Sequence, residues 1–253
     1  MNRRDKLAKK SGGYMLKEIK RKKSVFTRVV LIQLVVMFSF TVNGFLVSIT
    51  SPADPLLHYI GLLPLSAGLL FFMRKRIDVG LLDGPSVKSA WKWTWLLAAV
   101  LMFMIWDQYP FHQGSFTFYI LLFSSQFFIV AFIEEVVYRG YLLHIMKGYG
   151  IRKAIFLSSF LFAVTHCLGM LGGQSPGQTL LQVVYAFVVG IALSVIAIRT
   201  QTLMIGIVFH ALNNMIQLLG EGEPSIMASY ILLLIFIMYG FRHWILMSDE
   251  AYT

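Results

Sequence analysis

Two adjacent carboxylates and an arginine lie within an apolar stretch that runs from residue 116 to residue 146, in the sequence Glu134-Glu135-Val136-Val137-Tyr138-Arg139. Ionisable side chains inside an apolar segment of membrane-spanning length are costly, and by default they indicate a functional site. Residues four apart share one face of a helix, so Glu135 and Arg139 are expected to form a buried ion pair. Glu134 points about 100° away, without a partner on its own helix, and is the carboxylate that is left for chemistry.

Two further polar groups occur in later apolar segments. Phe162 and His166 are one helical turn apart, and His210 and Asn214 also share a helix face. Each lies at a similar distance from the nearest basic residue that flanks its segment. Glu134 lies 13 residues before Lys147, His166 lies 13 after Lys153, and His210 lies 11 after Arg199. At the rise of an α-helix this places all three at one depth, roughly 16–20 Å from the flank, where they are expected to form a single polar chamber.

The residue types in this chamber are those needed to hydrolyse a peptide bond. A carboxylate and an imidazole that converge on a water molecule form a general-base pair, which predicts that Glu134 and His166 activate water. His210 and Asn214 would donate hydrogen bonds to an oxyanion. The alternative is a metal site in which Glu134, His166 and His210 are three zinc ligands and water is the fourth; the spacing leaves this question open.

The elements that must position these groups are apolar segments long enough to cross a bilayer. The 253 residues are 57% hydrophobic and 13% charged, whereas soluble domains are about 45–50% apolar and about 25% charged. The segments predict an all-α, polytopic membrane protein with eight transmembrane helices. Their approximate bounds are 29–50, 56–73, 91–107, 116–146, 154–171, 179–198, 202–219 and 226–247.

The distribution of basic residues orients these segments. Every Lys and Arg other than Arg139 falls on one side of the predicted bundle, and the four connectors on the other side hold none: 51–55, 108–115, 172–178 and 220–225. By the positive-inside rule, both termini of this multi-pass cell-membrane protein are expected in the cytoplasm. Residues 1–28 are expected to form a basic cytoplasmic tail that meets membrane lipids, and 29–247 the transmembrane domain. The net charge of +10 is thereby explained by topology, and no nucleic-acid partner is expected.

Three motifs follow one another on successive predicted helices: Glu-Glu-x-x-x-Arg at 134–139, Phe-x-x-x-His at 162–166 and His-x-x-x-Asn at 210–214. In this order, over about residues 116–219, they resemble the CPBP family, the type II CAAX endopeptidases and their bacterial Abi relatives. The resemblance implies an intramembrane endopeptidase with an eight-helix core and the same roles for the four candidate catalytic residues. The remaining motif residues would support them structurally: Glu135, Arg139 and Phe162. The resemblance favours a glutamate-dependent mechanism with no cofactor, and zinc is the alternative.

The resemblance also implies a cavity reached from the cytoplasmic side, so the substrate is expected to be a membrane-associated peptide or protein that enters from the cytoplasm or the bilayer. Bacterial relatives are linked to peptide maturation and to bacteriocin self-immunity. The competing hypothesis is a non-proteolytic membrane partner, such as an immunity or scaffolding protein, whose effect would survive the loss of Glu134. A proton-coupled carrier is disfavoured because the polar residues do not follow both halves of a path.

Overall fold

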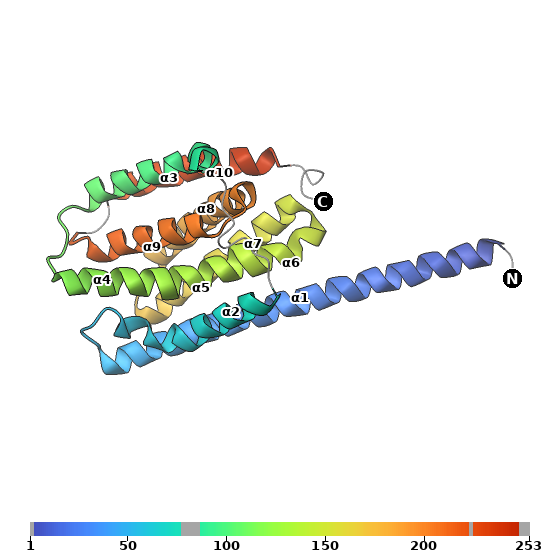
Figure 1. The fold of residues 1–253 in the computed structure, drawn as a ribbon, viewed down its shortest axis with the longest axis horizontal. Helices are drawn as coiled ribbons and strands as arrows, with labels where there is room; N and C mark the ends of the chain where they lie inside the picture. The colour runs from blue at the N-terminus through green and yellow to red at the C-terminus, as the bar shows by residue number, and fades with distance from the viewer. Residues whose placement is uncertain (1–2, 77–86, 223–224, 248–253) are drawn as a thin grey trace. The chain divides into compact units, whose positions relative to one another are not determined.

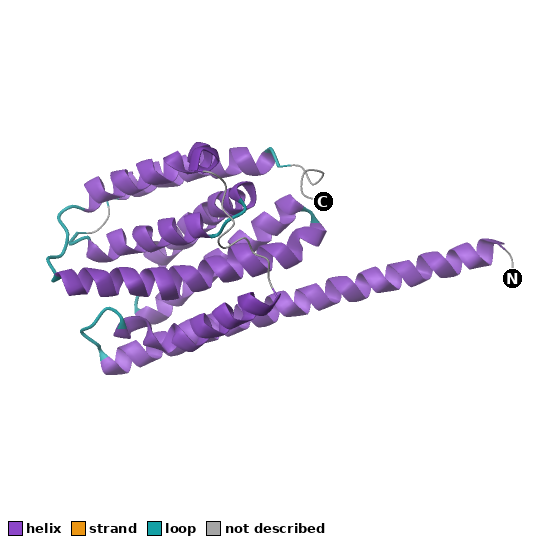
Figure 2. Cartoon of the chain, viewed as in Figure 1, coloured by secondary structure: helices purple, strands orange, loops and turns teal. Residues whose placement is uncertain are grey.

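Apolar side chains dominate every long element, and a segment inside a bilayer satisfies all its backbone hydrogen bonds internally only as a helix. The computed structural model describes residues 3–76, 87–222 and 225–247, and side chains for 22–73, 90–91, 93–222 and 225–247. Within these residues every regular element is a helix and no β-strand occurs (Figures 1 and 2). The prediction of an all-α membrane protein is confirmed.

The helices follow one another with short connectors. In chain order they are α1 (Arg3–Thr50), η1 (Leu57–Leu62), α2 (Leu63–Arg76), α3 (Val87–Gln108), α4 (Phe116–Ser125), η2 (Gln126–Ala131), α5 (Phe132–Glu135), η3 (Val136–Leu142), α6 (Leu143–Met146), η4 (Lys147–Tyr149), α7 (Ile151–Thr165), η5 (His166–Gly172), α8 (Pro176–Thr200), α9 (Met204–Leu219) and α10 (Ile226–Ile245).

Each predicted apolar segment is occupied by helix. Five stretches are long and apolar enough to cross a membrane: 22–50, 116–149, 151–172, 176–200 and 226–245. The other three predicted segments correspond to shorter apolar helices at 57–73, 93–108 and 204–219. The side chains of Arg74, Lys75, Arg76, Lys88 and Lys92, on which part of the predicted charge asymmetry depends, lie outside the described residues.

The chain divides into two compact units, Met1–Val36 and Met37–Thr253. Within the described residues of the first, helix α1 begins at Arg3, so most of the predicted basic tail is helical. In the second, α8 is the central helix: it packs against α7 and α10, and its residues 188–196 are all buried. One apolar core joins α8 to α3, α9 and α10, around Val100, Leu193, Phe209 and Phe236.

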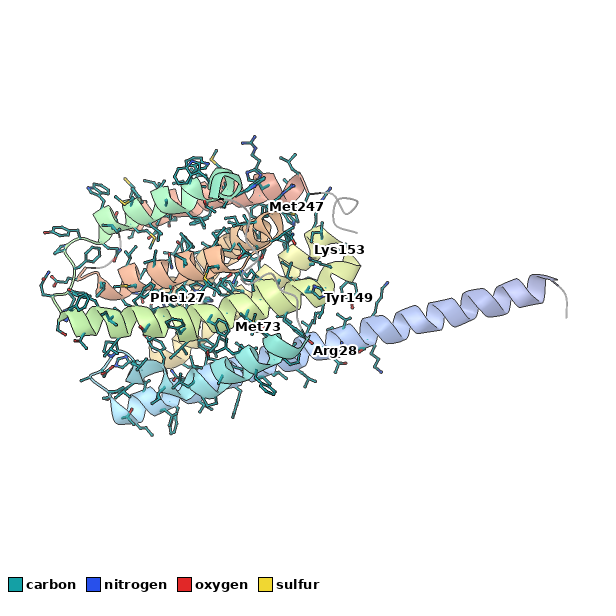
Figure 3. All side chains as sticks on the ribbon, viewed as in Figure 1. Arg28, Met73, Phe127, Tyr149, Lys153 and Met247 are labelled. Carbon is teal, nitrogen blue, oxygen red and sulfur yellow. The ribbon has the colours of Figure 1, made fainter. Side chains whose placement is uncertain are left out.

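The two ends of the second unit differ in composition. One end, here called the connector end, contains the 108–115 connector and the end of α9. Two backbone hydrogen bonds join them: the N–H of His112 donates to Leu219 O at 2.7 Å, and the N–H of Glu221 donates to Pro110 O at 3.2 Å. At the opposite end, the basic end, Arg152 Nε donates to Met247 O at 2.7 Å. Figure 3 shows Tyr149, Lys153 and Met247 at this end.

The helix that carries the two glutamates is continuous from Phe116 to Tyr149 but is not a regular α-helix throughout. Two π-helical segments, η2 and η3, flank the short α5, which contains Glu134 and Glu135. A π-helical turn holds more residues than an α-helical one, and such turns occur frequently at functional sites. The irregularity is therefore centred on the carboxylates that the sequence singles out.

Candidate active site

The predicted ion pair between Glu135 and Arg139 is present and buried. Arg139 Nη1 lies 3.0 Å from Glu135 Oε1, and the two side chains are 0% and 1% exposed. The Arg139 guanidinium also lies over the ring of Phe162, with 4.0 Å between its central carbon and the ring centroid. The pair therefore ties the 116–149 helix to α7 through a cation–π contact.

Two glycines make room for this pair on neighbouring helices. A Cβ atom added to Gly190 of α8 would lie 3.2 Å from Arg139 Nη2, and one added to Gly206 of α9 would lie 2.8 Å from Glu135 Oε2. The second distance is shorter than a Cβ contact can be, so α9 can approach Glu135 this closely only because position 206 lacks a side chain. Nothing in the local sequence around Gly206 indicates this role.

His210 bridges the two glutamates. Its Nε2 atom lies 3.2 Å from Glu134 Oε2, and its Nδ1 atom lies 3.0 Å from Glu135 Oε1. As expected, Glu134 has no partner within the motif on its own helix. Its partner is His210 of α9. At these distances each ring nitrogen can share a hydrogen with the carboxylate oxygen that it faces, so His210 links the two carboxyl groups.

His166 lies at the junction of α7 and η5, where the chain changes from α-helix to a tighter 3₁₀ turn. Its Nδ1 atom is 3.0 Å from the backbone carbonyl oxygen of Phe162, which can only accept, so Nδ1 is the donor. The neutral ring then carries its lone pair on Nε2. The ring of Phe162 packs edge-on against His166 with 4.8 Å between centroids, and against His210 with 5.7 Å. Phe162 thus contacts both histidines and the arginine.

A chain of side-chain hydrogen bonds orients Asn214. Its Nδ2 donates to Gln126 Oε1 at 3.1 Å, its Oδ1 accepts from Asn213 Nδ2 at 3.3 Å, and Tyr185 OH donates to Asn213 Oδ1 at 3.1 Å. Gln126, Asn213 and Tyr185 were not among the site residues predicted from the sequence. A signal was present for Gln126, a polar residue within an apolar stretch, eight residues before Glu134 and so on the same helical face.

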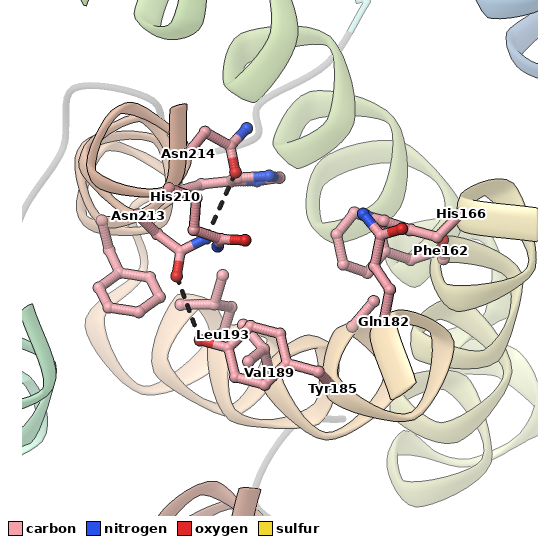
Figure 4. A pocket seen from close by; sticks show the side chains of 12 residues that line it. Phe162, His166, Gln182, Tyr185, Val189, Leu193, His210, Asn213 and Asn214 are labelled. Carbon is pink, nitrogen blue, oxygen red and sulfur yellow. Dashed lines mark hydrogen bonds between the residues drawn. The ribbon is translucent and has the colours of Figure 1, made fainter. Parts of the chain in front are cut away.

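All four predicted catalytic residues line one cavity of ≈ 340 Å³: Glu134, His166, His210 and Asn214. Figure 4 shows an adjoining pocket, in which His210 and Asn214 face Phe162, His166 and Gln182 from the other side. This smaller pocket of ≈ 60 Å³ continues between α8 and α9 and is closed by Val189, Leu193 and Phe209. Residues from three separate segments of the sequence are thereby brought to a single polar chamber, as the common depth predicted.

The zinc alternative requires three side chains that converge on one metal ion. Among the described residues, no group of three His, Cys, Asp or Glu side chains is arranged to hold a metal ion. The two ring nitrogens of His210 face carboxylate oxygens, Nε2 that of Glu134 at 3.2 Å and Nδ1 that of Glu135 at 3.0 Å.

The fold and the buried cluster define a helical membrane protein with a polar chamber between its helices. Residues 115–216 match the family model described as type II CAAX prenyl endopeptidase, Rce1-like, and this match supports a CAAX-type intramembrane endopeptidase in general. The resemblance to the CPBP family is confirmed, and the matched range contains all three motifs. No curated protein matches the sequence.

Proposed function

We propose that this chain hydrolyses a peptide bond in a membrane-associated peptide or protein, with Glu134 and His166 activating water and His210 and Asn214 stabilising the oxyanion. The observation that supports these roles is the cavity that all four side chains line, within the Rce1-like domain. Glu135, Arg139 and Phe162 hold the chamber in shape.

The hydrogen-bonding capacity of Glu134 and His166 suits a water nucleophile. The Glu134 carboxylate accepts one hydrogen of the water, and Nε2 of His166 accepts the other, because Nδ1 is already engaged by Phe162. The water oxygen bonds to the carbonyl carbon of the substrate while its proton passes to Glu134. When the carbon–nitrogen bond breaks, that proton passes to the leaving nitrogen, so one water yields one carboxyl group and one amine.

The oxyanion that forms at the carbonyl oxygen needs hydrogen-bond donors. Asn214 Nδ2 has two hydrogens, of which one goes to Gln126, so the second remains for the oxyanion. His210 Nε2 faces Glu134 in the resting site. As Glu134 takes the proton from water it loses its negative charge, and the N–H of His210 becomes available to the oxyanion at the moment when charge develops there.

The proposal includes the membrane topology. The eight apolar helices cross the bilayer, the shorter three included, and both termini lie in the cytoplasm because the basic residues lie on that side. The basic residues of the tail contact anionic lipid headgroups. The proposed reaction uses no metal or other cofactor, and its biological use is peptide maturation or bacteriocin self-immunity.

The test compares cells that express the wild type and Glu134→Gln at matched levels, by mass spectrometry of peptides in membranes and medium. A peptide cut only by the wild type supports the proposal and identifies the substrate. The control is Glu221→Gln, an exposed glutamate in the connector after α9, which should cleave like the wild type. Identical peptide profiles for wild type and Glu134→Gln, with a biological effect that survives the substitution, would support the non-proteolytic partner instead.

A further inference from the structure

Part of the wall around the candidate catalytic residues comes from a segment of the chain that precedes the family match. Phe40 of α1 and Tyr59 of η1 line the same cavity as Glu134, whereas the match begins at residue 115. Both residues belong to the second compact unit, which begins at Met37. The family match therefore covers the four candidate catalytic residues but not the whole of the cavity that they line.

Buried polar contacts hold Tyr59 in this wall. The side-chain amide of Asn43, which is 8% exposed, donates at 2.9 Å to the backbone carbonyl of His58, the residue before Tyr59. In α2, which continues directly from η1, Ser66 Oγ donates at 2.9 Å to the carbonyl of Phe128 in the π-helical segment η2. The η1 helix also packs directly against η2. Tyr59 is thereby fixed beside the helix that carries the two glutamates.

Gln126, the first residue of η2, carries a buried donor without an acceptor. Its Oε1 accepts the hydrogen bond from Asn214 Nδ2, but its Nε2 has no hydrogen-bond partner within the described part of the chain. The residue is 1% exposed and lines the cavity. Because buried donors are nearly always satisfied in folded proteins, the missing acceptor points to a molecule that binds in the cavity.

Tyr59 supplies a second donor beside this amide. Its hydroxyl is close enough to interact with the Gln126 side chain and with the charge of Glu134. A carbonyl oxygen has two lone pairs, so it can accept from a hydroxyl and an amide N–H together. Because Gln126 Oε1 contacts Asn214 Nδ2 at 3.1 Å, Gln126 Nε2 is at most about 5.5 Å from Asn214 Nδ2, a distance that one or two residues of extended peptide span.

We propose that Gln126 Nε2 and the Tyr59 hydroxyl form a subsite that binds a backbone carbonyl oxygen of the substrate, one or two residues from the scissile bond. The proposal rests on the proposed function and adds a residue from outside the family match to it. Gln126 then acts through two atoms: Oε1 orients Asn214, and Nε2 binds the peptide. Holding a neighbouring peptide unit in this way sets which bond of the substrate lies against Glu134.

Binding is tested on the full chain in detergent by NMR of glutamine side chains labelled with ¹⁵N. The signals of Gln126 are those that disappear in Gln126→Met. The probe is acetyl-alanine methylamide, which offers only neutral carbonyl acceptors. We expect a saturable shift of the Gln126 signals and none for Gln178, which is exposed and does not line the cavity. The absence of a Gln126 shift up to the solubility limit of the probe overturns the proposal.

Two comparisons show whether this binding has the proposed chemistry. Acetyl-alanine, with a free carboxylate, is the matched probe, and a Gln126 shift with this acid alone contradicts a carbonyl subsite. Tyr59→Phe removes one donor and keeps the ring, so it should raise the Kd of acetyl-alanine methylamide about 2- to 10-fold. Tyr230→Phe, at an exposed tyrosine outside the cavity, should leave that Kd unchanged. An unchanged Kd in Tyr59→Phe contradicts the role given to Tyr59.

Cleavage of a Glu134-dependent peptide tests the same contact during the reaction. Tyr59→Phe should raise KM and change kcat less. Replacing one backbone carbonyl oxygen of that peptide by sulfur, a weaker acceptor, should raise KM for the wild type at a position near the scissile bond, with little further effect in Tyr59→Phe. Equal effects of sulfur in both proteins at every position contradict the proposal. If no Glu134-dependent peptide exists, the proposed function fails, whereas a probe shift still shows that Gln126 binds a carbonyl.

Discussion

Replacing Arg139 by methionine should destabilise the protein by leaving Glu135 charged and buried with one partner fewer. Removing one member of a buried ion pair costs about 3–5 kcal/mol. Glu135 keeps His210, whose Nδ1 lies 3.0 Å from the same Oε1 atom that Arg139 contacts, so we expect the lower end of this range, about 3 kcal/mol. For a chain of this length that corresponds to a decrease in Tm of roughly 6–12 °C.

The assay is thermal unfolding of the purified protein in detergent, followed by intrinsic tryptophan fluorescence. Lys153→Met is the control, because Lys153 is exposed at the basic end and its loss should leave Tm within about 1 °C. The double variant Glu135→Gln with Arg139→Met leaves no unpaired charge, so it should be at least about 1 kcal/mol more stable than Arg139→Met alone. A Tm for Arg139→Met within about 2 °C of the wild type would refute this account of the ion pair.

Three further predictions follow from the chamber. Gly206→Ala should place a Cβ 2.8 Å from Glu135 Oε2 and lower stability by roughly 1–3 kcal/mol, whereas Gly68→Ala, with nothing within 4 Å, should not; equal Tm values would contradict the packing argument. His166→Ala should abolish cleavage while the Tm stays near that of the wild type, and retained turnover would remove His166 from the mechanism. Chelator treatment of purified protein should leave cleavage unchanged; loss of activity that zinc restores would favour the metal mechanism.

The helical architecture could be predicted from the sequence because each apolar segment satisfies its own backbone and is recognised without knowledge of its neighbours. The pairing of Glu135 with Arg139 was predictable for the same reason, since both residues lie on one helix at fixed spacing. The common depth of Glu134, His166 and His210 also followed from local counting, because the bilayer gives separate helices one shared axis along which positions can be compared.

Rotation and approach between helices were decided only by the tertiary structure. Spacing along α9 does not reveal that His210 contacts both glutamates, because that depends on how closely α9 approaches α5, which Gly206 permits. Gln126 joins the site only because its amide meets Asn214 across two helices. Tyr59 likewise lines the chamber only because η1 packs against η2, and neither segment of the sequence encodes that contact alone.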